Sequence, residues 1–201
     1  INTINAVKTV YGVDIIGYEI TEEPCKVEFY NTESGISSGS VLNNKTLLKA
    51  GEKLLKRGAE TIAVVCKFEE PPEDNYQNGE GVDIVGGVEA VISHYLTREL
   101  KVPVAHSPAF EDITISKEIV DPKASAEYIT PTFLPCILLG LSNAPLFSYE
   151  KVEHYISVES LKALIMPYNS LGSSIVLDAA TKNIKVYAVK ENNTVLNVTK
   201  N

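Results

Sequence analysis

The sequence predicts an α/β fold in which a mostly parallel sheet is flanked by helices and an antiparallel hairpin closes the chain. An amphipathic helix is expected over residues 45–57, and a short, nearly continuous apolar strand follows over residues 61–68. A second helix over residues 88–100 leads into a strand over residues 102–105. Helices that alternate with β-branched apolar strands are typical of a parallel sheet buried on both faces.

The remaining elements of the first half are less regular. We expect a short helix over residues 3–11 and strands over residues 13–20 and 26–30, followed by a turn-rich stretch over residues 31–40. In the helix over residues 45–57, the small Gly51 shares the apolar face with four leucines, which predicts close packing on a sheet. Gly58 is expected to end this helix.

The second half begins with two expected helices, because Asp121-Pro122 and Thr130-Pro131 each combine a capping residue with a proline at the first helical position. The second of these helices is apolar nearly all round, which predicts that it is buried and that Cys136 packs in the core. A helix over 158–163, a short strand to 166, a turn over 171–174, a strand over 175–177 and a hairpin of 184–189 with 195–198 complete the chain. We predict one domain over residues 1–201.

Composition excludes several classes of partner. The net charge is −8 and the pI is about 5.0, which disfavours binding to nucleic acid or to an anionic membrane. The basic residues of the first long helix are expected to form its solvated face: Lys49, Lys53, Lys56 and Arg57. Apolar runs are too short to span a bilayer, and no signal peptide is apparent. We therefore expect a cytoplasmic protein.

The cysteines and histidines predict no metal site. Cys25, Cys66 and Cys136 lie far apart in the sequence and match neither a disulfide framework nor a zinc motif, so reduced thiols are expected. The histidines also lack metal-ligand spacing, and the sequence identifies no cofactor.

The first candidate binding segment is the Ser- and Gly-rich stretch that precedes the helix over residues 45–57. Hydroxyls and free backbone N–H groups beside a helix N-terminus attract anions, so this segment is a candidate anion site. The alternative is a flexible turn with an N-cap. The residues assigned to the site are Ser34, Ser37, Ser38 and Gly39.

The second candidate is the glycine-rich approach to the helix over residues 88–100. Gly81, Gly86 and Gly87 would let a ligand approach the backbone, but their spacing does not match a dinucleotide-binding loop. Asp83 and Glu89 place two carboxylates at the helix entry, where they either contact a ligand or cap the helix.

His106 is the leading candidate for proton transfer. It is expected just past the strand over residues 102–105, and open α/β sheets bind ligands at the carboxyl ends of their strands. A histidine there acts as a general acid or base, or it is a hydrogen-bonded structural residue. His94 is expected on the flank of its helix, a plain surface position unless another layer covers it. His154 is expected on the surface.

A third candidate segment lies near the C-terminus. Gly172 and Ser173 fall in a polar turn that offers donors to an oxyanion or a phosphate, and the alternative is a plain turn.

Several ordered motifs resemble the DUF3326 family, a domain of unknown function. They include Gly81-Val82-Asp83, the run from Gly86 to His94, Pro103-Val104-Ala105-His106-Ser107-Pro108 and the run from Phe133 to Pro145. Residues 54–65 and 190–194 are also similar to the family. Because family members have an extra glycine-rich N-terminal segment, the resemblance implies that this chain acts in a larger assembly, as a homo-oligomer or with a separate N-terminal segment.

Two functions of different classes are consistent with these residues. The leading hypothesis is an enzyme acting on a small anionic metabolite, phosphorylated or carboxylated. In it the Ser34 segment binds the anion, while His106, Glu89, His94 and Asp83 handle protons. The alternative is a non-catalytic sensor or interaction subunit, whose glycine-rich loops only shape a surface. Convergence of these segments on one pocket would favour the enzyme.

Overall fold

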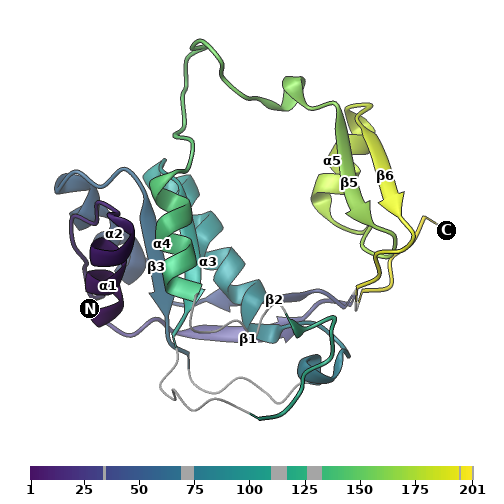
Figure 1. Cartoon of the computed structure of the whole chain (residues 1–201), viewed down its shortest axis with the longest axis horizontal. Helices are drawn as coiled ribbons and strands as arrows, with labels where there is room; N and C mark the ends of the chain where they lie inside the picture. Colours follow the sequence, from purple (N-terminus) through teal and green to yellow (C-terminus); the bar gives the residue numbers. More distant parts are fainter. Residues whose placement is uncertain (34, 69–74, 110–116, 126–132, 195, 201) are drawn as a thin grey trace.

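A computed structural model describes residues 1–33, 35–68, 75–109, 117–125, 133–194 and 196–200. Figure 1 shows a larger N-terminal unit, residues 1–142, and a smaller C-terminal unit, residues 163–200, joined by an arch over residues 143–162. Among the described residues, no helix is long and apolar enough to cross a membrane.

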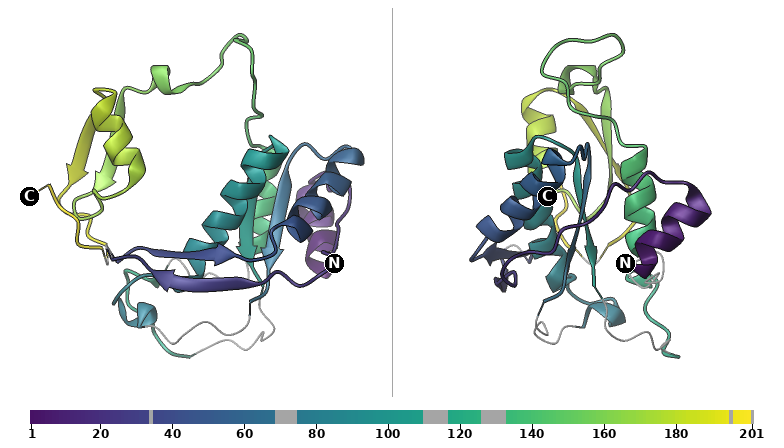
Figure 2. Two further views of the ribbon diagram at one scale, coloured as in Figure 1. Left: turned by 180° about the vertical axis from the view of Figure 1, so that it is seen from behind. Right: turned by 90° about the vertical axis from the view of Figure 1, so that its left-hand side faces the viewer.

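The core of the N-terminal unit is a parallel pair of strands between two layers of helices. β3 (Ile62–Cys66) and β4 (Val104–Pro108) are paired in parallel, with Val64 opposite His106. Helix α3 (Ile84–Leu100) joins the two strands and packs on one side of them, while α4 (Phe133–Ser142) packs on the other side (Figure 2). On β3, Ile62, Val64 and Cys66 are buried while Val65 is 46% exposed, and on β4 Ser107 is buried.

Helix α3 supplies the centre of this core. Val88, Ile92, Leu96 and Leu100 recur every four residues, and the first three are at most 2% exposed. The helix begins at Ile84, four residues earlier than predicted, because the Asp83 carboxylate accepts a hydrogen bond from Val85 N at 3.0 Å and caps it. A short 3₁₀ turn, Tyr76–Asn78, precedes this start.

Two further helices complete the N-terminal unit: α1 (Asn2–Tyr11), which packs on α4, and α2 (Lys45–Lys56), which packs on α3. Gly58 follows α2 with a φ of 97°, as expected for a residue that ends a helix. Gly51 packs on Leu100 of α3 and not on a sheet, so that part of the prediction was wrong. The basic face of α2 is solvated and pairs with the preceding segment through Lys53–Glu22 (3.0 Å) and Arg57–Glu19 (2.8 Å).

An antiparallel hairpin lies across α3. It consists of β1 (Val27–Asn31) and β2 (Ser37–Val41), with Phe29 opposite Gly39. Residues 37–40 therefore form a strand and not the turn that the sequence predicted. Residues 13–20, which we expected to be a strand, follow α1 without joining a sheet.

The C-terminal unit is a second parallel pair. β5 (Ala163–Pro167) and β6 (Lys185–Val189) are joined by helix α5 (Ser174–Thr181), and a single 3₁₀ turn, Val158–Ser160, precedes β5. The predicted antiparallel hairpin and the predicted strand over 175–177 were wrong, because residues 174–181 form a helix that returns the chain to the same end of the sheet. The C-terminal tail adds one parallel bridge, Ser170 to Val198.

Two predictions about the middle of the chain also need correction. Helix α4 has no buried residue, and Cys136 is exposed although we placed it in the core. Of the helix expected after Asp121, the described part, residues 121–125, forms a turn, and residues 126–132 lie outside the described chain.

Candidate functional site

The candidate site is the contact between α3 and β4, where His106 meets Ser93 and lies near His94 and Asp83. His106 lies inside β4 and not past its end as predicted, because the strand continues to Pro108. Its ring nevertheless lies against α3, where it is half-buried and hydrogen-bonded to Ser93. Glu89, one helical turn before Ser93, is 6% exposed. Asp83 and His94 belong to the same helix. We call Asp83, Glu89, Ser93, His94 and His106 the α3–β4 site.

Ser93 contacts one nitrogen of the His106 ring. Its Oγ lies 2.9 Å from His106 Nδ1 and 3.2 Å from the Ala90 carbonyl oxygen. When the Ser93 hydroxyl donates to Ala90, Oγ accepts the proton of Nδ1 and Nε2 is the basic nitrogen of the ring. When the hydroxyl turns to the ring, Nδ1 is the acceptor.

The surroundings keep this ring neutral. Burial lowers the pKa of His106 below its ordinary value of 6.5, and the nearby His94 lowers it further, whereas the Asp83 carboxylate raises it. A general base must be unprotonated before it acts, so these effects favour the basic form of His106 at neutral pH.

The hairpin and the glycine-rich segment meet at the first turn of α3. A Cβ on Gly87 would overlap the Ser37 carbonyl and lie 2.6 Å from Ser38 N, so β2 touches the helix where it begins. Gly39 is buried beneath Val88 in the same contact. Gly86 lies beside the capping Asp83 carboxylate, and Gly81 has a φ of 71° in the segment before the helix. Ser34 lies outside the described residues.

Gly172 and Ser173 lie in the C-terminal unit, across the arch from α3 and β4 (Figure 1). The Ser173 side chain accepts a hydrogen bond from Val176 N and caps α5. A Cβ on Gly172 would lie 3.1 Å from the Val198 side chain of the tail, so the tail passes close to this glycine. These contacts give both residues a role in holding the C-terminal unit together, and the structure does not bring them to the α3–β4 site.

Sequence reasoning missed two features of this region. Ser93 was not singled out, although a polar residue on the buried stripe of a helix is a signal for an internal partner. Cys25 and Cys66, 41 positions apart, are hydrogen-bonded to each other: this bond lowers the pKa of Cys25 and, together with burial and Glu89, raises that of Cys66. Such a pairing between distant elements leaves no mark in the local sequence.

A cavity of about 460 Å³ lies apart from the α3–β4 site, at the N-terminus of α2. Its polar lining is already used within the protein, since Asn43 bonds the backbone of Pro24 and Lys26, and Thr46 bonds that of Glu23. Among the residues that the structure describes, no group of three or more His, Cys, Asp and Glu side chains could hold a metal ion.

Comparison with known proteins gives a family but no activity. An uncharacterized lipoprotein of Synechococcus sp. is 36% identical over 199 residues, which is 96% of this chain and 55% of that protein. The chain thus spans about half the length of this relative. No solved structure matches this chain. A family model described as a protein of unknown function, DUF3326, matches residues 1–201, so the chain belongs to the DUF3326 family.

Proposed function

We propose that the α3–β4 site transfers a proton to or from a small metabolite, with His106 as the general base. The observation that carries this proposal is the Ser93–His106 hydrogen bond, which holds the ring through Nδ1. In the tautomer with its proton on Nδ1, Nε2 is the acceptor. A hydrogen bond to one ring nitrogen orients the imidazole, which supports a role in general-base catalysis.

The neighbouring groups support a change of charge on His106 during the reaction. Once Nε2 has accepted a proton, the Asp83 carboxylate stabilises the resulting imidazolium, because it raises the pKa of this ring. His94 is exposed beside it and is the second group able to exchange protons with solvent. Glu89 lies buried on the same helix and supplies a further carboxylate to the site.

We propose a small anion, phosphorylated or carboxylated, as the ligand. Ser37 and Ser38 adjoin the first turn of α3, where backbone N–H groups attract negative charge. Three carboxylates oppose anion binding nearby: Asp83 already caps α3, and Glu22 and Glu23 line the start of α2. An anionic ligand would therefore bind through the serine hydroxyls and backbone N–H groups, because the neutral His106 ring does not offset this charge. The cytoplasmic location stays a prediction, because the Synechococcus relative is named a lipoprotein.

The test is substrate consumption followed by NMR in pools of phosphorylated and carboxylated metabolites. We expect the wild-type chain to consume at least one member, and His106→Asn to slow that reaction by about 10² to 10⁴-fold. His154→Asn is the matched control, because the His154 side chain is 90% exposed and remote from α3. The variant His106→Asn should bind the same metabolite, as seen in amide shifts of residues 37, 38 and 87.

Two results would overturn the proposal: no consumption of any pool by the wild-type chain, or equal rates for His106→Asn and the control. The alternative function, a non-catalytic interaction subunit, is favoured by a different observation. Residues 146–161 expose a series of large apolar side chains, as a protein-binding segment does.

A further inference from the structure

The arch and the C-terminal unit expose many large apolar side chains. Along the arch, residues 142–163 are all exposed except Ala144 and Ser157. Tyr149 and Ile156 are 79% and 83% exposed. We call the large apolar side chains of this segment the apolar arm: Leu146, Phe147, Tyr149, Val152, Tyr155, Ile156, Val158 and Leu161.

The β5–β6 sheet continues this surface. Leu164, Met166 and Val186 are partly buried, whereas their neighbours Ile165 and Tyr187 are 70% and 53% exposed. Ile165 and Tyr187 are partners in the strand register and so share one face. Parallel strands are stable when both faces are covered, and in the described chain α5 packs on β6 of this pair. We call Ile165, Tyr187 and Val189 the open sheet face.

The total exposed area of the chain is larger than that of a compact monomer of the same mass. The chain exposes 14242 Å², whereas a compact monomer of 21.9 kDa exposes about 9,300 Å². The excess over the whole chain is about 5,000 Å², and the arch and the C-terminal unit contribute to it. If two copies each buried half of it, the interface would bury about 5,000 Å² in total, within the range of obligate homodimers.

Charge favours a second copy of the chain as the partner. Residues 143–191 contain five acidic and five basic side chains, so this segment is neutral and the net charge of −8 lies entirely outside it. Two copies of a surface with no net charge meet without the repulsion that the rest of the molecule would impose. An apolar face that is the same on both partners also suits a twofold contact, in which the same surface patch of each copy faces the other.

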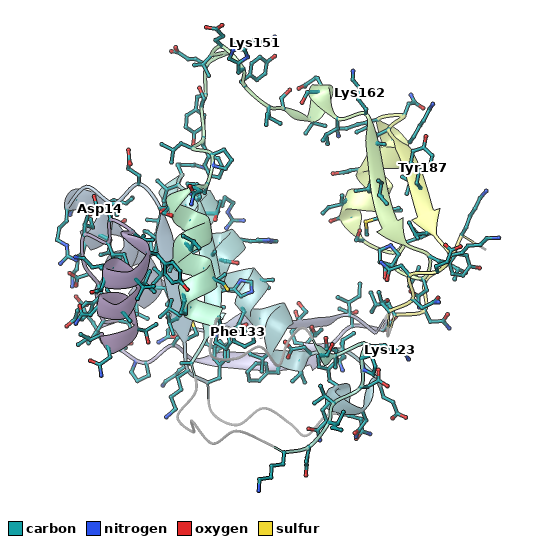
Figure 3. The ribbon with its side chains drawn as sticks, in the orientation of Figure 1. Asp14, Lys123, Phe133, Lys151, Lys162 and Tyr187 are labelled. Carbon is teal, nitrogen blue, oxygen red and sulfur yellow. The ribbon has the colours of Figure 1, made fainter. Side chains whose placement is uncertain are left out.

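We propose that the apolar arm and the open sheet face form the dimer interface of this protein, with a second copy of the chain as the occupant. The two open sheet faces pack on each other, and each arm lies along the partner's C-terminal unit. Figure 3 labels three residues of this surface: Lys151 and Lys162 lie in the arch, and Tyr187 lies on β6. The inference is independent of the proton-transfer function.

Sedimentation velocity over a hundredfold range of concentration is the first test. The wild-type chain is expected to sediment as a dimer, and Ile165→Glu combined with Ile156→Glu is expected to weaken the dimer at least 100-fold. Ile20→Glu is the matched control: Ile20 is 76% exposed but lies in the N-terminal unit, so this variant should remain a dimer. Circular dichroism establishes whether each variant is folded.

A second measurement keeps the proposal falsifiable if the double variant does not fold. Wild-type chains of natural and ¹⁵N composition are mixed and cross-linked through lysines, and mass spectrometry should find mixed-isotope links that join Lys151 or Lys162 to Lys185 or Lys190. A wild-type chain that stays monomeric, or that forms only links within one chain, overturns the proposal. Binding of such a monomer to phosphatidylcholine vesicles would assign the surface to lipid instead.

Discussion

At the scale of single residues, the chemistry of His106 depends on contacts that come from a different element. The sequence identified the histidine and its strand, but it placed the ring past the end of β4, and it did not identify Ser93. We expected this strand to end at residue 105, but it continues to Pro108, which occupies the last strand position. The tautomer could not be predicted, since it depends on whether the Ser93 hydroxyl donates to Ala90 or to the ring.

The pKa of His106 predicts how stability depends on pH. Because burial lowers this pKa in the folded state, the unfolded chain binds more protons once the pH falls below 6.5, the ordinary value. The contribution of His106 to stability is complete above that value and is lost as the pH falls from it toward the lowered folded pKa. Titration of the ring protons by NMR should give a midpoint for His106 below 6.5. In His106→Gln, the urea unfolding midpoint should change less with pH in this range. A midpoint of 6.5 or higher would contradict the burial argument.

At the scale of elements, the hydrophobic pattern predicted the long helices well and the short apolar runs badly. The periodic residues of α2 and α3 specify a helix face over several turns, so both helices were expected within a few residues of their positions. The run over residues 175–177 is only one turn long, and its Ile and Val suit a strand equally. The deciding feature is the Ser173 cap, which makes the following residues helical.

The contact between α3 and β2 predicts a test at Gly87. Alanine is better than glycine in a helix by about 1 kcal/mol, so Gly87→Ala would stabilise α3 if nothing lay beside it. The added Cβ would instead overlap the Ser37 carbonyl, which is backbone and cannot rotate away. We expect a net loss of about 1–3 kcal/mol in urea unfolding. Gly140→Ala in α4 is the control: it meets no atom within 4 Å and should be neutral or stabilising.

At the scale of the whole molecule, the sequence indicated parallel strands and helices in alternation but not how they group. Pairing of β3 with β4, and of β5 with β6, depends on contacts made after a helix has crossed between the strands, and local patterns do not encode those contacts. The arch was likewise unpredictable, because its apolar residues follow neither helical nor strand periodicity. The same grouping separates Gly172 and Ser173 from the α3–β4 site.

Our prediction of one domain over residues 1–201 can be tested through Asn169, which holds the tail in the C-terminal unit. Its side chain donates to Thr194 O at 2.8 Å and accepts from Thr194 N at 2.9 Å, so Asn169→Ala leaves these half-buried backbone groups without partners. The expected cost is about 1–3 kcal/mol. Asn193→Ala, which changes an exposed side chain of the same unit, is the control.

Hydrogen exchange by mass spectrometry then separates two outcomes. If the chain is one cooperative domain, exchange in Asn169→Ala rises by a similar factor in β5, β6, α3 and β4, because all of them open together. If the arch joins two units that open separately, exchange rises about tenfold or more in residues 163–200 alone, and the one-domain prediction is wrong.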